Sequence, residues 1–462
     1  MRLNILKRKK KGATTHEGAE AFEPLTDEQR LRRSVLSCML WEDEFYEDGE
    51  TITARIGDAA ARVDPEVLAK IAIEARTKMN LRHAPLLLLT VLAKTGAKRE
   101  KLVANTVATV IQRADELSEL VAIYWRNGKR PLSAQLKKGL ARAFEKFDAY
   151  ELAKYDRPGP VRLRDVLFLV HAKPKAAEQA ETWKKLAAKE LDSPDTWEVA
   201  LSSGGDKRET FERLLKEKKL GYLALLRNLR GMTDAGVDQK LIEKAILARK
   251  GAERVLPFRY IAAAKAAPQL EGAIDKAMLA GLAETPKLRG RSLIVVDVSG
   301  SMYGGMMSKK SDMNRALAAS ALGAIAREVC EEPIIYATAG NDVTRVHATK
   351  MVPARRGMAM ADAIYGMCQP LGGGGIFLNQ VMRFLEPKHP KVDRIIVITD
   401  EQDCGIAGDS PLEAPTFGRT NYMINVGSFR NGIGYEKDKW VHIDGFSEQV
   451  LRYIQAYEKL YH

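Results

Sequence analysis

The chain has 462 residues, of which 45% are hydrophobic and 29% are charged, and its formal net charge is +13. This length predicts more than one domain, and the mixed charges are typical of a globular protein rather than a disordered one. The longest apolar run, "APLLLLTVLA", is about half of the ~20 residues that a membrane helix needs. We therefore expect no membrane partner.

The N-terminal segment "MRLNILKRKKKG" is strongly basic, and no apolar stretch of the kind found in secretory signals follows it. We interpret residues 1–15 as a flexible basic arm. The four cysteines (Cys38, Cys330, Cys368 and Cys404) are far apart and form no CxxC pair. This spacing argues against a zinc ribbon or a disulfide framework and favours a cytoplasmic protein.

Residues 16–288 show a helical pattern throughout. Apolar residues recur at three- and four-residue spacing in "PEVLAKIAIEARTKMN", in "SAQLKKGLARAFEKF" and over the long stretch "REKLVANTVATVIQRADELSELVAIYW". Thr, Asp or Ser precedes several of these segments, where it can cap a helix, and Gly or Pro follows. Many amphipathic helices in succession predict stacked helical pairs of the solenoid type, although no fixed sequence period is present.

The excess positive charge lies in this helical region. Residues 1–290 hold 54 of the 73 Lys and Arg residues and 41 of the 60 Asp and Glu residues, whereas residues 291–462 hold 19 of each sign. This asymmetry predicts that a polyanion such as nucleic acid meets the helical region through phosphate contacts. The alternative is that the charges form ordinary solvated surface.

Individual candidates for phosphate contacts share one side of a predicted helix: Lys137, Lys138 and Arg142. Arg227 and Arg230 are similarly placed. Aromatic residues near basic ones, which could stack on unpaired bases, are Tyr124, Trp125 and Tyr222. For these three, packing in the core is the favoured interpretation.

From residue 289 to residue 462 the pattern changes to strands and helices in alternation. "SLIVVDV", "PIIYATA", "RIIVITD" and "NYMINVG" are aliphatic strands, and amphipathic helices lie between them. Such alternation predicts a parallel, doubly wound sheet that is covered on both faces. The expected fold class is thus α + α/β, with an all-α N-terminal domain at 16–288 and a doubly wound α/β domain at 289–462.

Oxygen-bearing side chains follow two strands of the second domain. Asp297, Ser299 and Ser301 come directly after "LIVV", and Asp400 ends the strand "RIIVITD". Because the carboxyl ends of parallel strands meet at one edge of a sheet, these side chains can surround a hard cation such as Mg²⁺. We predict a divalent cation held by these four residues. The alternative is that Ser299 and Ser301 only cap the following helix.

Catalytic patterns are missing from the sequence. A phosphohydrolase of the haloacid dehalogenase type needs a second Asp two residues after its nucleophile, where this chain has Ser299. The patterns G-x-S-x-G, G-x-x-x-x-G-K-[ST] and H-E-x-x-H are also missing. We expect a protein that is not an enzyme.

The second domain resembles a von Willebrand factor A domain, whose metal-ion-dependent adhesion site has the pattern D-x-S-x-S and a later strand-terminal Asp. That family usually adds a Thr from a "GGT" loop, whereas this chain reads "PLGGGGIFLNQ" with Gly374 in that place. The resemblance therefore implies a divalent cation, Mg²⁺ by its ligands, that is bound more weakly than usual.

The whole chain resembles the Ro autoantigen family, in its bacterial or phage-type members, whose helical part is the TROVE module. The resemblance is carried by "LTDEQRLRRSVL", "FLVHAKPK", "LALLRNLRGMT" and "VLPFRYIAA". It implies a ring of HEAT-like repeats that binds Y-like noncoding RNA on its outer basic surface and single-stranded ends of misfolded RNA in its hole. It also implies a role in RNA quality control or maturation, with an exoribonuclease as a possible partner.

The resemblance places RNA-binding residues near "HAKP". It implies His171, with Lys154, Tyr155 and Arg157 upstream, and we add Arg162, Arg164 and Lys173 as neighbours that could extend the surface. His171 ends an apolar helix, where the helix dipole favours a cation. An alternative function is a protein-interaction module in which the cation of the A-type domain captures an acidic residue of a partner.

Overall fold

The computed structural model describes residues 27–35, 49–79, 81–202, 204–255, 257–304, 313–405, 408–427, 440–444 and 449–461. The predicted arm at residues 1–15 lies outside these ranges. Packing divides the described chain into two compact units. A helical unit holds residues 50–285 together with the first and last helices, and a sheet unit holds residues 286–446.

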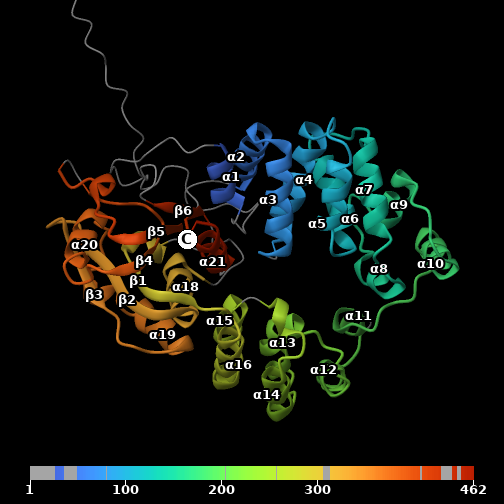
Figure 1. Cartoon of the computed structure of the whole chain (residues 1–462). Coiled ribbons are helices and arrows are strands. Elements are labelled where there is room, and N and C mark those ends of the chain that lie inside the picture. The colour runs from blue at the N-terminus through green and yellow to red at the C-terminus, as the bar shows by residue number, and fades with distance from the viewer. Residues whose placement is uncertain are drawn as a thin grey trace, which may run out of the picture. The chain divides into compact units, whose positions relative to one another are not determined.

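The helical unit is built of short α-helices, shown in Figure 1 in blue to yellow-green, except for α21, which is red. Its first part comprises α1 (Asp27–Val35), α2 (Gly49–Arg62), α3 (Pro65–Thr77), α4 (His83–Thr95), α5 (Leu102–Val110), α6 (Asp115–Tyr124), α7 (Ala134–Phe144), α8 (Ala149–Tyr155), α9 (Leu163–Val170) and α10 (Ala177–Ala188). Its second part comprises α11 (Trp197–Ser202), α12 (Lys207–Lys216), α13 (Tyr222–Asp234), α14 (Gln239–Ala248), η1 (Ala252–Arg254), α15 (Pro257–Ala266), η2 (Pro268–Leu270), α16 (Glu271–Ala283) and, from the end of the chain, α21 (Gln449–Tyr461).

The helices stack as the sequence predicts. In the first part α3, α5, α7 and α9 pack in one series, and α4 packs on α6 beside it; in the second part α13 packs on α15 and α14 on α16. Local sequence fixes several helix starts: the side chain of Asp64 accepts from the backbone N–H of Glu66 at 2.9 Å, and Pro65 occupies the first turn of α3. Asp148 and Glu151 form a capping box at α8.

The stretch 99–125, which shows a continuous helical pattern, forms two helices. The first of them, α5, ends at Val110, and Ile111 adopts an extended backbone. A carboxylate oxygen of Glu116 accepts from the backbone N–H groups of Gln112 (2.8 Å) and Arg113 (3.1 Å). Because these bonds stabilise a turn, the chain reverses before α6, and Arg113 lies at the corner.

The sheet unit contains six strands in the order β3-β2-β1-β4-β5-β6. They are β1 (Leu288–Asp297), β2 (Cys330–Asn341), β3 (Val346–Met351), β4 (Val392–Thr399), β5 (Gly418–Asn425) and β6 (Val441–Asp444). The other elements of the unit are α17 (Gly300–Gly304), α18 (Arg315–Val329), α19 (Gly357–Tyr365), η3 (Gln369–Leu371), α20 (Leu378–Leu385) and η4 (Pro411–Glu413).

The expected α + α/β class is confirmed, but the sheet is not wholly parallel, and its edge strands β3 and β6 were not among the four strands predicted. The central strands are parallel, and Val295 of β1 stands level with Tyr336 of β2 and Val397 of β4. The edge strand β3 is antiparallel to β2, so the sheet is mixed. The sequence "VHATKM" of β3 lacks the aliphatic run that marks a buried strand, since this edge strand is half-exposed.

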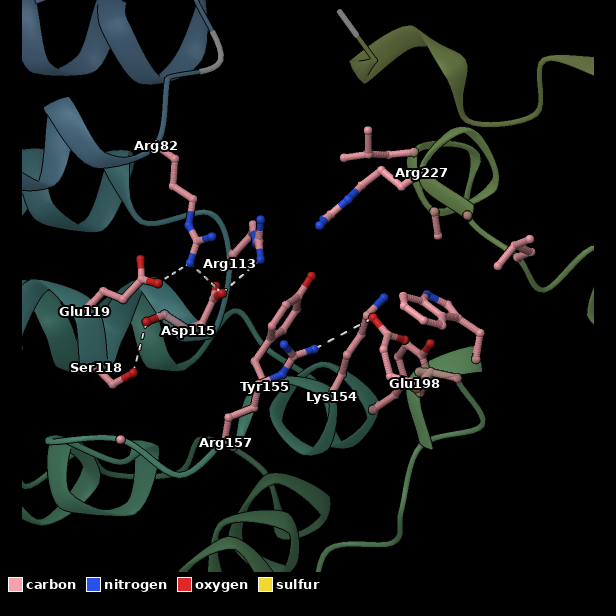
Figure 2. Close-up of a pocket in the computed structure, with 18 of the residues that line it drawn as sticks. Arg82, Arg113, Asp115, Ser118, Glu119, Lys154, Tyr155, Arg157, Glu198 and Arg227 are labelled. Carbon is pink, nitrogen blue, oxygen red and sulfur yellow. Dashed lines mark hydrogen bonds and ion pairs between the residues drawn. The ribbon is translucent and has the colours of Figure 1, made fainter. Parts of the chain in front are cut away.

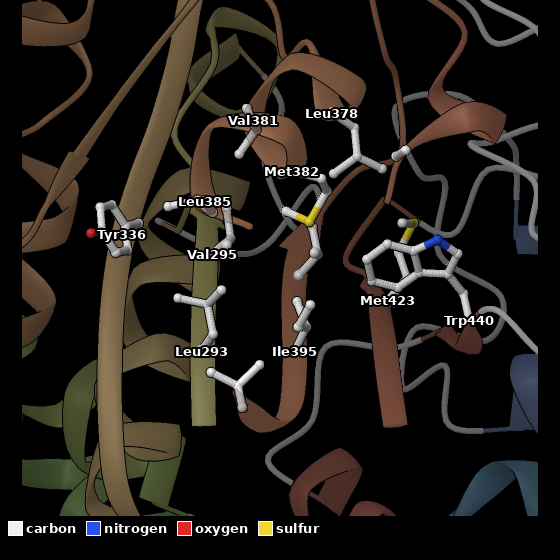
Figure 3. Close-up of a cluster of buried hydrophobic side chains, with 13 residues drawn as sticks. Leu293, Val295, Tyr336, Leu378, Val381, Met382, Leu385, Ile395, Met423 and Trp440 are labelled. Carbon is white, nitrogen blue, oxygen red and sulfur yellow. The ribbon is translucent and has the colours of Figure 1, made fainter. Parts of the chain in front are cut away.

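Helices cover both faces of the sheet. Alternate strand residues such as Leu293, Val295 and Ile395 pack against α20 in a buried apolar cluster that Figure 3 shows. The intervening residues face α18, where a β-carbon at Gly323 would lie 2.9 Å from the side chain of Val296. This close packing holds the ends of β1 and β4 side by side, which is where the predicted cation ligands lie.

The sequence analysis expected the closing helix to belong to the α/β domain. Packing instead groups α21 with the helical unit. Among the described residues, no helix is both long and apolar enough to cross a membrane.

Candidate functional site

A pocket of about 730 Å³ lies within the helical unit and combines residues from both of its parts (Figure 2). The first part contributes the start of α4, the turn before α6, α6 itself, and α8 with the loop that follows it. The second part contributes the loop before α11 and the start of α13. The charged and aromatic residues of the lining are Arg82, Arg113, Asp115, Glu119, Tyr150, Lys154, Tyr155, Arg157, Asp195, Trp197, Glu198, Lys219, Tyr222 and Arg227.

On one wall, two arginines and two carboxylates form an ion-pair cluster. Arg82 contacts Asp115 at 2.7 Å and also pairs with Glu119, while Arg113 lies 2.9 Å from Asp115. Burial raises the pKa of Glu119 to about 7, despite the opposing effect of Arg82. The charge of this wall therefore changes near neutral pH.

The neighbouring wall, from α8, presents aromatic rings beside cations. The guanidinium of Arg113 lies 4.8 Å from the ring centre of Tyr155, and the ammonium of Lys154 lies 5.7 Å from the rings of both Tyr150 and Tyr155. The side chain of Tyr150 is 50% exposed. Rings that are open to solvent and flanked by cations can stack on other flat groups as well as hold the cation.

The carboxylates of the lining are all engaged by cations. Besides the cluster, Glu198 lies 3.9 Å from Arg157, and Asp195 contacts Lys219 at 3.1 Å. Hydrogen bonds from Arg213 and Lys219 lower the pKa of Asp195 to about 2. Asp195 is therefore ionised at any ordinary pH.

Two cations of the lining have no such carboxylate partner among the described residues. They are Lys154 on α8 and the exposed Arg227 on α13. In Figure 2 the guanidinium of Arg227 extends from α13 toward Arg113 and Tyr155 on the other wall. The pocket thus offers uncompensated positive charge next to the exposed ring of Tyr150.

The structure brings together three of the predicted RNA-binding residues: Lys154, Tyr155 and Arg157 all line the pocket. The sequence analysis did not single out Arg82 or Arg113. No local signal marks them. Arg82 reaches the pocket from the start of α4, and Arg113 reaches it from the turn between α5 and α6. Arg227 was noted, but its position opposite Lys154 was not foreseeable from a separation of more than seventy residues.

The other predicted residues lie outside the lining of the pocket. Arg162 precedes α9, Arg164 lies on α9, and His171 ends α9 in the left-handed region at φ 51°. His171 and the following Lys173 are exposed. Arg164, Phe168 and His171 are spaced four and three residues apart and so share one face of α9, where the ring of Phe168 is 60% exposed. The sequence analysis missed Phe168; an exposed aromatic cannot be told from a core one by spacing alone.

The third predicted group lies on α7. Lys138 is exposed and Lys137 is half-buried, while Arg142 donates to the side chain of Asn105 on α5 at 2.9 Å. The guanidinium of Arg142 therefore ties two helices together as well as facing solvent. Among the noted aromatics, Tyr124 and Tyr222 are buried, and the hydroxyl of Tyr222 donates to the carbonyl of Ile246 at 2.7 Å, as the core interpretation predicts.

At the edge of the sheet, the predicted cation ligands do come together. Asp297, Ser299 and Asp400 are fully buried, and the hydroxyls of Ser299 and Ser301 lie 3.2 Å apart. Asp297 accepts from the backbone N–H of Ser299 at 2.8 Å and from the hydroxyl of Thr399 at 2.7 Å. Burial, and then the carboxylate of Asp400, raises the pKa of Asp297 to about 7.

Two further features of this edge do not fit a divalent-cation site of the expected kind. A β-carbon at Gly374 would lie 2.6 Å from the carbonyl oxygen of Gly340, so the present backbone has no room for the usual threonine. The guanidinium of Arg315, at the start of α18, lies 3.6 Å from Asp400, and both side chains are fully buried. Across the described ranges, no group of three or more His, Cys, Asp and Glu side chains is arranged to hold a metal ion.

Comparison with known proteins finds one similar family and one similar fold. The TROVE domain family matches residues 184–365, which begin in α10 and end in α19. The fold is similar to the crystal structure of the Ro (Rsr) protein of Deinococcus radiodurans, with a TM-score of 0.61 and 18% sequence identity, over 91% of this chain and 96% of that chain. Residues 184–365 are therefore similar to the TROVE domain family, and the chain has a Ro-like fold, in which a helical region is followed by a six-stranded α/β unit.

Proposed function

We propose that this protein is an RNA-binding scaffold of a small ribonucleoprotein, and that the pocket of the helical unit holds an unpaired RNA segment. The observation that carries the proposal is the position of Lys154 and Arg227 on opposing walls, without carboxylate partners among the described residues, beside the exposed ring of Tyr150. Phosphates need cations that are not already neutralised, and unpaired bases need open rings on which to stack.

The pocket suits a single strand better than a duplex. A cavity of about 730 Å³ has room for a few nucleotides at most, whereas an RNA helix is far wider. The walls also lack the apolar enclosure typical of a site for a small hydrophobic ligand, because ion pairs line them. We infer that the segment is a single-stranded end, such as that of a misfolded RNA.

Structured RNA of the Y-like class is assigned to a second surface, formed by Arg164, Phe168, His171 and Lys173 on and after α9. Three of these four residues can carry positive charge, and Phe168 gives the surface a ring against which an unpaired loop base can stack. Binding of these two RNA classes would support RNA quality control or maturation, with an exoribonuclease acting on the bound RNA. In this proposal the protein itself performs no catalysis.

A matched pair of double variants tests the pocket. Lys154→Gln with Arg227→Gln removes two charges from the lining, whereas Lys240→Gln with Lys244→Gln removes two exposed charges from α14, outside the pocket. Affinity for a fluorescent single-stranded RNA is measured as a function of salt. We expect the pocket variant alone to bind more weakly and to lower the slope of log K against log salt by about 1.4, since each phosphate contact on a single strand contributes about 0.7.

Equal losses in both double variants would show that only net charge matters and would refute the pocket assignment. The proposal also fails if the pocket variant keeps the affinity and salt slope of the unaltered protein. Circular dichroism of both variants checks that the helices remain folded.

A further inference from the structure

We propose that Arg315 takes the place of the divalent cation at the edge of the sheet, so that this A-type unit holds its strand ends together without a metal. The inference rests on the buried contact between Arg315 and Asp400 and on the packing around Gly374. It is independent of the RNA-binding proposal, because all of these residues belong to the sheet unit.

Two buried carboxylates lie at this edge of the sheet. Asp297 ends β1, Asp400 directly follows the neighbouring parallel strand β4, and both carboxylates are fully buried. Buried carboxylates at such close range repel each other, and a buried anion is tolerated only with a cationic or hydrogen-bonding partner. Asp297 receives hydrogen bonds from Thr399 and Ser299. The guanidinium of Arg315 lies 3.6 Å from the carboxylate of Asp400 and supplies positive charge there.

Arg315 lies where a cation is unfavourable by itself. It is the first residue of α18, after the capping residue Asn314, whose side chain accepts from the backbone N–H of Leu317 at 2.9 Å. A cation in the first turn of a helix is opposed by the helix dipole, and a fully buried guanidinium also loses its hydration. A nearby carboxylate offsets both costs, and that of Asp400 lies within ion-pair distance of Arg315.

The glycine loop offers no side-chain oxygen ligand for a metal at Gly374. The loop at Gly372–Gly375 is fixed against the strand ends: Gly374 donates to the carbonyl of Gly340 at 3.0 Å and accepts from the backbone N–H of Gly300 at 3.1 Å. Because a β-carbon at Gly374 would collide with the carbonyl of Gly340, no side-chain hydroxyl can enter from this position. The edge has therefore lost an oxygen ligand and gained a buried positive charge.

A consequence for function follows. A divalent cation with an open coordination position can capture an acidic residue of a partner, whereas a guanidinium held by an internal carboxylate and closed off from solvent cannot. The alternative function given by the sequence, capture of an acidic partner through the cation, is then closed to this chain.

The test uses the full chain with Mn²⁺ as a paramagnetic substitute for Mg²⁺. Electron paramagnetic resonance of free Mn²⁺ is recorded in a titration with the unaltered protein, and thermal unfolding is measured with Mg²⁺ and with a chelator. We expect no saturable binding up to millimolar Mn²⁺ and the same midpoint in both solutions. One equivalent of Mn²⁺ bound at submillimolar concentration, reversed by Mg²⁺ and lost in Asp400→Asn, would overturn the proposal.

Variants of the pair give a second, independent readout. Arg315→Met removes the positive charge beside the buried carboxylate of Asp400 and should lower the unfolding midpoint by roughly 10 °C. Adding Asp400→Asn to the same chain should recover much of this loss, because the double variant buries no unpaired charge. Added Mn²⁺ should also raise the midpoint of Arg315→Met, since removing the guanidinium leaves the carboxylate oxygens for the ion. Additive effects of the two substitutions, with no recovery, would refute the pairing. Should Arg315→Met not fold, the Mn²⁺ titration of the unaltered protein decides alone.

Discussion

Replacing Glu116 by alanine should destabilise the helical unit and disturb the pocket together. Glu116 is fully buried and accepts three hydrogen bonds: from Arg76 at 2.7 Å and from the backbone N–H groups of Gln112 and Arg113. Breaking a buried ion pair by removing one partner costs about 3–5 kcal/mol, and the two backbone bonds that fix the α5–α6 turn are lost with it. We expect a loss near the upper part of that range.

The assay is urea unfolding followed by circular dichroism at 222 nm, which reports mainly on helices. Glu212→Ala is the matched control, because it removes an acidic partner from an ion pair with Arg208 on an exposed surface. The control should unfold at the midpoint of the unaltered protein, whereas Glu116→Ala should unfold at clearly lower urea. Unfolding of both variants at the urea midpoint of the unaltered protein would refute this reasoning. That result would mean that Arg76 reaches solvent once Glu116 is gone, and that the turn does not depend on Glu116. Weaker single-strand binding by Glu116→Ala is also expected, because Arg113 lies in the same turn.

Two further predictions concern the RNA surfaces. Burial raises the pKa of Glu119 to about 7, so this side chain gains negative charge as the pH rises from 6 to 8, and affinity for single-stranded RNA should fall a few-fold over that range. In a fluorescence titration, Glu119→Gln should flatten this dependence of affinity on pH. An unchanged pH profile in that variant would contradict the assignment. In competition assays, Phe168→Ser should weaken binding of a structured RNA and leave binding of a single strand intact, because the exposed ring of Phe168 lies on α9 and not in the pocket lining. Loss of both binding activities would show that the two RNAs share one surface.

Much of the fold could be predicted because it depends on local patterns. The aliphatic runs at the ends of β1 and β4 mark buried parallel strands, and parallel strands place their carboxyl ends at one edge. That reasoning correctly brought Asp297 and Asp400 together. Strand β3 escaped prediction because its residues are half-exposed and it lacks an aliphatic run. The position of the break before α6 was not predicted, because a local hydrogen bond from the backbone N–H of Gln112 to Glu116, and not a Gly or Pro, marks it.

The parts that could not be predicted depend on where a long side chain goes in three dimensions. Arg315 stands in a sequence that reads as an ordinary amphipathic helix, and only the packing of α18 beside β4 turns it toward Asp400. Arg113, in the turn before α6, and Arg227, on α13, are far apart in the chain, and both line one pocket because of how the helical pairs stack. Sequence spacing carries no information on either contact.

Crosslinking tests the central proposal most directly. The full chain is bound to a short single-stranded RNA carrying 4-thiouridine, irradiated, digested, and analysed by mass spectrometry for peptides that carry a nucleotide. The account predicts crosslinks to the segment 150–157 and to the start of α13 at 221–228, which face each other across the pocket. Crosslinks confined to residues 286–446 of the sheet unit would contradict it.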